Sequence, residues 1–105
     1  MRIEGDGLLV RIYVGETDHW HDRPLYQAIV ELLRARGIEG FGARSHLHTT
    51  RILRLSEDLP VLIEAVDAED KIRGLLPELD AMVGDGLITL EHVEVITYRA
   101  SDPTR

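Results

Sequence analysis

The sequence predicts a single α+β domain in which two helices cover one face of an antiparallel sheet. Three observations lead to this fold class. Apolar residues alternate with polar ones in one stretch and form short runs in others, as strands with a core face do. In two further stretches they recur every three to four residues, which is the helical period. The chain has 105 residues, enough for one such core.

The first part of the chain predicts a strand and then a helix. Leu8 to Val14 alternates, so that its even-numbered positions form one apolar face. Asp22 is the expected N-cap of the helix, Pro24 lies in its first turn, and Gly37 is expected to end it. The helical face is formed by Leu25, Ala28, Ile29, Leu32 and Leu33.

A second strand and helix follow Pro60. The mostly apolar run 61–66 predicts an interior strand. Asp67 is expected to cap the helix, with Asp70 at the capping-box position. The buried stripe of this helix is Ile72, Leu75, Leu76, Leu79, Met82 and Val83. Pro77 lies inside that stripe and is expected to kink the helix or split it.

The final segments complete a known arrangement. Residues 87–98 predict the last strand, and 100–105 a frayed tail. A ferredoxin-like βαββαβ sandwich then needs one more strand between Gly37 and Pro60, for which Thr50–Leu55 is the best candidate. The prediction is one domain over 1–105 with a functional loop at 38–50.

Composition excludes several function classes. The formal net charge of −7 argues against a nucleic-acid partner, because phosphate backbones need a basic face. The chain has no cysteine, which excludes disulfides and thiolate chemistry. No apolar run reaches the ~18 residues of a membrane span, and no signal-peptide pattern opens the sequence. We therefore expect a cytoplasmic protein without stable membrane insertion.

The most unusual stretch is Gly40–Thr49. Its glycines let a backbone approach a ligand closely. Arg44 can bind an anion through its planar guanidinium. His46 and His48 can donate, accept or bind a metal. The stretch fits a ligand-binding loop, although an ordinary exposed connection has a similar composition.

Two other features leave alternatives open. Gly84-Asp85-Gly86 could form an anion site from backbone amides, or only a left-handed helix cap and a turn. The His-x-His pairs His19/His21 and His46/His48 could each present two imidazoles to one metal ion from an extended backbone, or lie in surface loops. No nucleophile elbow, P-loop or dinucleotide fingerprint is present, so we expect no enzyme activity.

Four segments together resemble the PII-like proteins of domain-of-unknown-function family 190. They are Leu9-Val10-Arg11-Ile12-Tyr13-Val14-Gly15-Glu16, Arg23-Pro24-Leu25-Tyr26, Gly40-Phe41-Gly42 and Leu53-Arg54-Leu55-Ser56-Glu57-Asp58-Leu59-Pro60. The resemblance covers nearly the whole chain. It implies a ferredoxin-like fold, a homotrimer like that of PII signalling proteins, and an adenine nucleotide (ATP, ADP or AMP) bound between subunits.

The resemblance also implies a binding site. PII proteins hold nucleotide phosphates with a long loop after the second strand and a glycine turn before the last one. Here these correspond to 40–51 and to the turn 84–86. The implied nucleotide-binding residues are Gly40, Gly42, Arg44, His46, His48, Arg51, Gly84, Asp85 and Gly86.

The chain departs from the family in two respects. The basic residues that hold phosphates in true PII proteins have no clear match after Gly86, where Leu87 stands. About one strand's length is also missing between Gly37 and Gly40.

The implied function is regulatory. The resemblance suggests a module that binds the nucleotide and signals through its loop to an unidentified partner protein, with no metal. The alternative is a divalent-metal-binding module of the same fold, resembling the divalent-cation-tolerance relatives of PII, that uses the His-x-His pairs. A small enzyme acting on a nucleotide is a third hypothesis.

Overall fold

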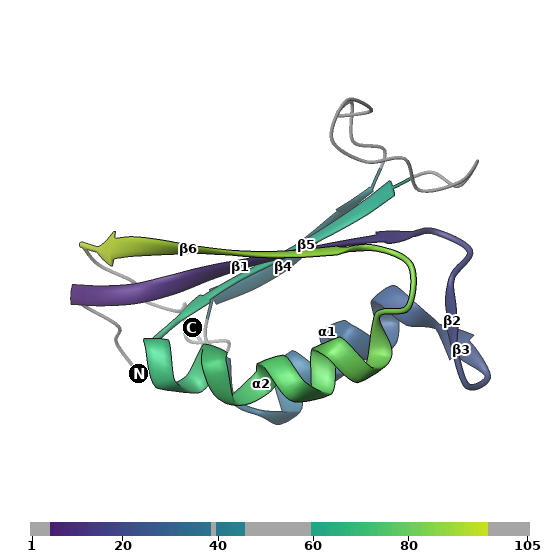
Figure 1. The fold of residues 1–105 in the computed structure, drawn as a ribbon, viewed down its shortest axis with the longest axis horizontal. Coiled ribbons are helices and arrows are strands. Elements are labelled where there is room, and N and C mark those ends of the chain that lie inside the picture. Colours follow the sequence, from purple (N-terminus) through teal and green to yellow (C-terminus); the bar gives the residue numbers. More distant parts are fainter. Residues whose placement is uncertain (1–4, 39, 46–59, 97–105) are drawn as a thin grey trace, which may run out of the picture.

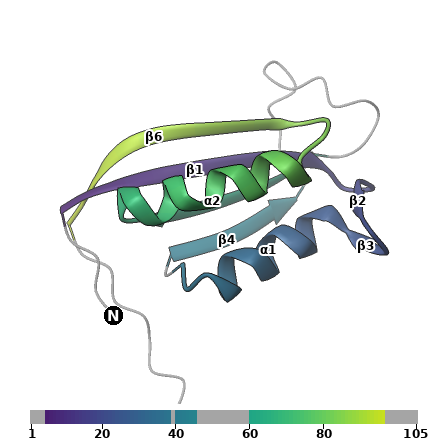
Figure 2. The same cartoon turned by 60° about the horizontal axis from the view of Figure 1, so that its bottom comes forward.

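The structure is a computed structural model that describes residues 5–38, 40–45 and 60–96. Its main sheet has four strands in the order β4–β5–β1–β6, and every neighbouring pair is antiparallel. The strands are β1 (Gly5–Gly15), β4 (Gly40–Ser45), β5 (Pro60–Asp67) and β6 (Leu87–Val95). Helices α1 (Leu25–Ala35) and α2 (Glu69–Met82) lie on one side of the sheet (Figures 1 and 2). The predicted ferredoxin-like sandwich is confirmed.

The core lies between the sheet and the helices. The sheet contributes buried residues from its two central strands, Leu8, Val10, Ile12, Val14, Val61, Ile63 and Ala65. The helices contribute Leu25, Ala28, Ile29, Leu33, Ile72, Leu75 and Leu79. Each fully buried Val, Leu or Ile side chain adds about 1.5–3 kcal/mol to the driving force for folding. The apolar residues that alternate along the strands therefore pack in this layer against those that recur every three to four residues along the helices.

Helix α1 begins after a short hairpin and ends as predicted. Strands β2 (His19–Trp20) and β3 (Arg23–Pro24) form the hairpin. The N-cap is Pro24 without a side-chain cap, so the prediction for Asp22 was wrong. The hairpin extends to Pro24, and the N–H of Leu25 donates instead to the carbonyl oxygen of Asp18 at 2.7 Å.

The C-terminus of α1 is a Schellman motif. Gly37 has φ 71° there, which favours glycine. The N–H of Ile38 donates to the Leu33 carbonyl at 3.0 Å, and the N–H of Gly37 donates to that of Arg34 at 3.1 Å. Ile38 and Leu33 are both buried, which supplies the apolar contact of the motif.

Helix α2 differs from the sequence prediction in two details. It is one helix through Pro77, so of the two predicted outcomes, a kink or a split, the split did not occur. Pro77 is exposed, and at this position it removes only one backbone hydrogen bond of the helix. Its N-cap is Ala68 rather than Asp67. Asp67 is buried just before the helix, accepts from the Ala68 N–H at 2.7 Å and pairs with Lys71 at 3.3 Å.

The second strand of the fold is β4, within the predicted loop. Residues 40–45 pair with β5 from Gly40 opposite Val66 to Ser45 opposite Val61. The prediction that all of 38–50 is loop was therefore wrong for these residues. Two glycines weaken the strand signal, but the free edge of β5 supplies the hydrogen-bonding partners. The candidate strand Thr50–Leu55 and the tail 100–105 lie outside the described residues.

The face of the sheet away from the helices carries a charged triad. Arg11 on β1 donates to Glu64 on β5 at 3.1 Å and to Glu91 on β6 at 2.9 Å. These hydrogen bonds, the one to Glu91 foremost, raise the pKa of Arg11 above its usual value. The triad therefore joins three neighbouring strands of the sheet. None of the helices in the described part of the chain is long and apolar enough to span a bilayer.

A small pH dependence is expected at the start of α2. Glu69 accepts a hydrogen bond from Arg73 at 2.8 Å, which lowers the pKa of Glu69 below its ordinary value. A lowered folded-state pKa stabilises the protein above the unfolded value, and this contribution is lost as the pH falls through the folded one. Glu69→Gln should thus lower the melting temperature slightly at pH 7 and have progressively less effect below about pH 4.5. Asp80→Asn, near the other end of α2, should not lower it, because a negative charge there opposes the helix dipole. An equal loss from Glu69→Gln at every pH would contradict this account.

Candidate functional site

One end of the sheet gathers the segments that were predicted to bind a ligand. There β1 leads into the hairpin, β4 ends, and β6 begins after the glycine turn (Figure 1). A single row of paired residues crosses the sheet at this end, formed by Arg44, Leu62, Tyr13 and Leu87. Arg44 and the turn before Leu87 therefore stand at the same level of the sheet.

The glycine turn is held against β1. Helix α2 ends at Met82, and Val83 continues in an extended conformation instead of the left-handed cap that the sequence also allowed. A Cβ atom on Gly86 would lie 2.4 Å from the carbonyl oxygen of Tyr13, so only glycine fits there. A Cβ atom on Gly84 would meet nothing within 4 Å. Asp85, between them, is exposed.

The two halves of the predicted site lie at opposite edges of the sheet. Strand β4 forms one edge and β6 the other, with β5 and β1 between them. Three strand spacings separate Arg44 from Leu87 by about 14 Å. Gly40 is the first residue of β4 and lies five residues, about 17 Å, from Ser45 at the other end of the strand. Within one chain, the backbones of Arg44 and of the glycine turn therefore lie well apart.

The remaining predicted residues have different outcomes. Gly42 is exposed on β4, with nothing near the position of an added Cβ atom. His46, His48 and Arg51 lie outside the described residues. The assignment of all nine residues to a nucleotide site stays a prediction.

The first His-x-His pair does not have the geometry of a bidentate metal site. His21 has φ 58° in the hairpin turn, so the backbone between His19 and His21 is not extended. The His21 ring packs edge-on against Trp20 at 4.7 Å. His19 Nδ1 lies 2.7 Å from the carbonyl oxygen of Thr17. The carboxylate of Asp18 accepts a hydrogen bond from the Gly15 N–H at 2.9 Å.

Across residues 5–38, 40–45 and 60–96, no group of three or more His, Cys, Asp or Glu side chains could hold a metal ion.

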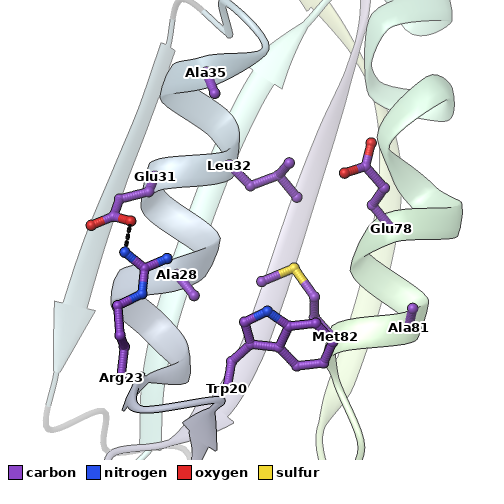
Figure 3. A pocket seen from close by; sticks show the side chains of 9 residues that line it. All are labelled: Trp20, Arg23, Ala28, Glu31, Leu32, Ala35, Glu78, Ala81 and Met82. Atoms are coloured by element: carbon purple, nitrogen blue, oxygen red, sulfur yellow. Dashed lines mark hydrogen bonds and ion pairs between the residues drawn. The ribbon is translucent and has the colours of Figure 1, made fainter.

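The helix side of the molecule contains two hollows that the sequence analysis missed. One, of about 410 Å³, lies between α1 and α2 (Figure 3). It is lined by Trp20, Arg23, Ala28, Glu31, Leu32, Ala35, Glu78, Ala81 and Met82. The other, of about 600 Å³, lies between α2 and β6 beside Leu90. No predicted nucleotide-binding residue lines either hollow. The available signal was three alanines, at positions 28, 35 and 81, on the helical faces that border the hollow.

The sequence matches a family model over most of its length. The model of domain-of-unknown-function family 190, described as "Uncharacterized ACR, COG1993", matches residues 7–95. A UPF0166 protein of Aquifex aeolicus is 34% identical over 97 residues, which cover 84% of this chain and 91% of that protein. A UPF0166 protein of Methanocaldococcus jannaschii is 33% identical over 97 residues, covering 83% and 89% of the two chains.

Solved structures share the fold at low sequence identity. The apo form of CPII from Thiomonas intermedia K12, a nitrogen regulatory PII-like protein, aligns with a TM-score of 0.60 and 16% identity, covering 94% of this chain and 100% of that one. CPII bound to ADP, AMP and acetate aligns with a TM-score of 0.61 and 15% identity, covering 90% and 91%. The fold of this chain is therefore that of PII-like proteins.

Proposed function

Because this chain belongs to domain-of-unknown-function family 190 and has a PII-like fold, we propose that it is a regulatory protein that binds an adenine nucleotide between copies of itself. The observation that carries the proposal is the separation of the predicted phosphate-binding segments. Arg44 and the glycine turn stand at one end of the sheet but at opposite edges. In a ring of copies, the β4 edge of one chain next to the β6 edge of another would bring these segments together.

The open face of the sheet supports such an assembly. Half-buried apolar side chains surround the Arg11 triad on the face away from the helices, namely Leu9, Tyr13, Val66, Leu87, Val93 and Val95. No described segment covers this face (Figure 1). A large group of apolar side chains on an uncovered face is typical of a protein–protein interface. We expect three copies to bury it, as the resemblance to PII proteins implies.

The nucleotide would be held mainly by backbone amides and arginine. Gly84 and Gly86 leave the backbone of the turn open to a phosphate, and Arg44 of a neighbouring copy would neutralise its charge. The ADP- and AMP-bound forms of CPII make these nucleotides the first candidates. The proposal includes no chemical step. The nucleotide would instead shift the balance between two conformations of the protein, and a partner protein would recognise one of them.

The first test is a thermal-shift titration with ATP, ADP and AMP. A ligand at about 100 times its dissociation constant adds about 2.7 kcal/mol to the folded state. For a domain of this size that corresponds to a rise of roughly 10–20 °C. Arg44→Ala should abolish most of the rise, whereas the matched variant Arg34→Ala, exposed on α1, should keep it. Light scattering should give about 36 kDa, the mass of three chains of 11.9 kDa.

Two results would contradict the proposal. One is the absence of a thermal shift with all three nucleotides. The other is an equal shift in Arg44→Ala and in the parent protein. A shift that appears only with zinc, copper or nickel would favour the metal-binding alternative instead.

A further inference from the structure

The groove between α1 and α2 is an open hollow on the side of the molecule away from the proposed subunit interface. Figure 3 shows Leu32 and Ala28 pointing into it from α1, Glu78 from α2, and Trp20 and Met82 at one end. Its volume of about 410 Å³ lies in the range of small-molecule sites. The lining is mostly apolar with few charged groups, which is also typical of such sites.

The groove exists because small residues face each other across the two helices. Ala28 and Ala35 lie seven residues apart on α1, and Ala81 lies on α2. Larger side chains at these positions would fill the space. Ala35 and Ala81 are exposed, so their small size is not required by the packed core.

The charged side chains that line the groove are two acids and one base, which sum to one negative charge. Arg23 and Glu31 form an ion pair, so they neutralise each other. Glu78 points into the gap (Figure 3) and is the third charged residue of the lining. It pairs across the helices with Arg36, whose side chain is 50% exposed. Exposed pairs of this kind are weak, so a ligand cation can take the place of Arg36.

The other end of the groove offers an aromatic surface and a thioether. Trp20 is partly buried against the core through β2, and its indole borders the hollow. An indole face attracts cations as well as apolar groups. Met82 is flexible and polarisable and adapts to varied apolar shapes.

We propose that the α1–α2 groove binds a small organic ammonium ion with an apolar body. The apolar body packs on Trp20, Leu32, Met82 and the alanines, and the ammonium group pairs with the Glu78 carboxylate. The net charge of −7 favours a cation over an anion at this surface. The site is independent of the proposed nucleotide site, which lies at the edges of the sheet.

Trp20 is the only tryptophan of the chain, so its fluorescence reports on this groove. The full-length protein is titrated with 2-phenylethylammonium, with the neutral 2-phenylethanol and with the anionic 3-phenylpropanoate. We expect a saturable change in emission with the ammonium compound in the millimolar range, a weaker one with the alcohol and none with the carboxylate.

Three variants locate the site. Glu78→Gln should weaken binding of the ammonium compound by about fivefold, since it removes the carboxylate charge. Ala81→Leu should weaken it on the order of tenfold or more by filling the hollow. Asp80→Asn removes the same charge from α2 but borders the other hollow, and it should bind like the parent protein. Circular dichroism and melting curves verify that each variant is folded.

Several outcomes would overturn the proposal. They are no saturable change with the ammonium compound, the same affinity for all three compounds, or unchanged binding in both Glu78→Gln and Ala81→Leu. A change in Trp20 emission that follows protein concentration without any ligand, and disappears in Ala81→Leu, would assign the groove to a second copy of the chain instead.

Discussion

Ile12→Ala is expected to lower the free energy of unfolding by about 2–5 kcal/mol. Ile12 is fully buried at the middle of β1, a central strand of the sheet. It stands opposite Ile63 on β5 and Ile88 on β6, and the helices cover the same face. Truncation removes apolar contacts and leaves a cavity that the surrounding strands cannot close. Native proteins are stable by only about 5–15 kcal/mol, so the loss is a large part of the total.

The matched control for this prediction is Ile96→Ala. Ile96 follows β6 and is 75% exposed, so the same chemical change should alter stability by no more than about 0.5 kcal/mol. Urea denaturation followed by circular dichroism measures both variants. The curves should be recorded at several protein concentrations, because an assembly stabilises its subunits by mass action. Similar losses in the two variants would mean that Ile12 does not lie in the core.

Periodicity predicted the central elements because local sequence and burial agree there. The even-numbered residues of β1 from Leu8 to Val14 are all buried, and the helical stripe of α1 faces them. Gly37 ended α1 with the backbone conformation that favours glycine. In these segments each residue's own preference and its tertiary environment point to the same structure.

The errors arose where tertiary contacts decided the local structure. Residues 40–45 have weak strand propensity, yet they complete the sheet because β5 offers an unpaired edge. Asp22 did not cap α1 because the β2–β3 hairpin extends the chain to Pro24. Pro77 was tolerated inside α2 at an exposed position. None of these contacts follows from the residues of the segment alone.

The candidate sites were predictable to different degrees. Residue chemistry singled out Arg44 and the glycine turn, but only strand order places them at one end of the sheet and at opposite edges. The α1–α2 groove combines Trp20 from the hairpin with Glu78 and Met82 from a helix far along the chain. No local pattern joins these residues, so this site required the structure.

Gly86→Ala is expected to lower the free energy of unfolding by about 3 kcal/mol, near the upper end of overpacking effects. The added Cβ atom would lie 2.4 Å from the Tyr13 carbonyl oxygen and 2.9 Å from Val83 Cγ1. Such contacts are far below van der Waals distance. The oxygen belongs to β1, which is paired on both sides, so it can move only if the sheet moves with it. Thermal and urea unfolding measure the loss.

Gly84→Ala is the matched substitution two residues earlier, and it distinguishes a structural glycine from a ligand-binding one. Gly84 has open space around the added atom and no positive φ, so the variant should be at least as stable as the parent protein. The fold gives no reason for glycine at this position, whereas close approach of a phosphate does. If the nucleotide binds at this turn, Gly84→Ala should reduce the nucleotide-induced rise in melting temperature without lowering the ligand-free melting temperature. An unreduced rise would leave Gly86 as a packing residue and move the phosphate site away from the turn.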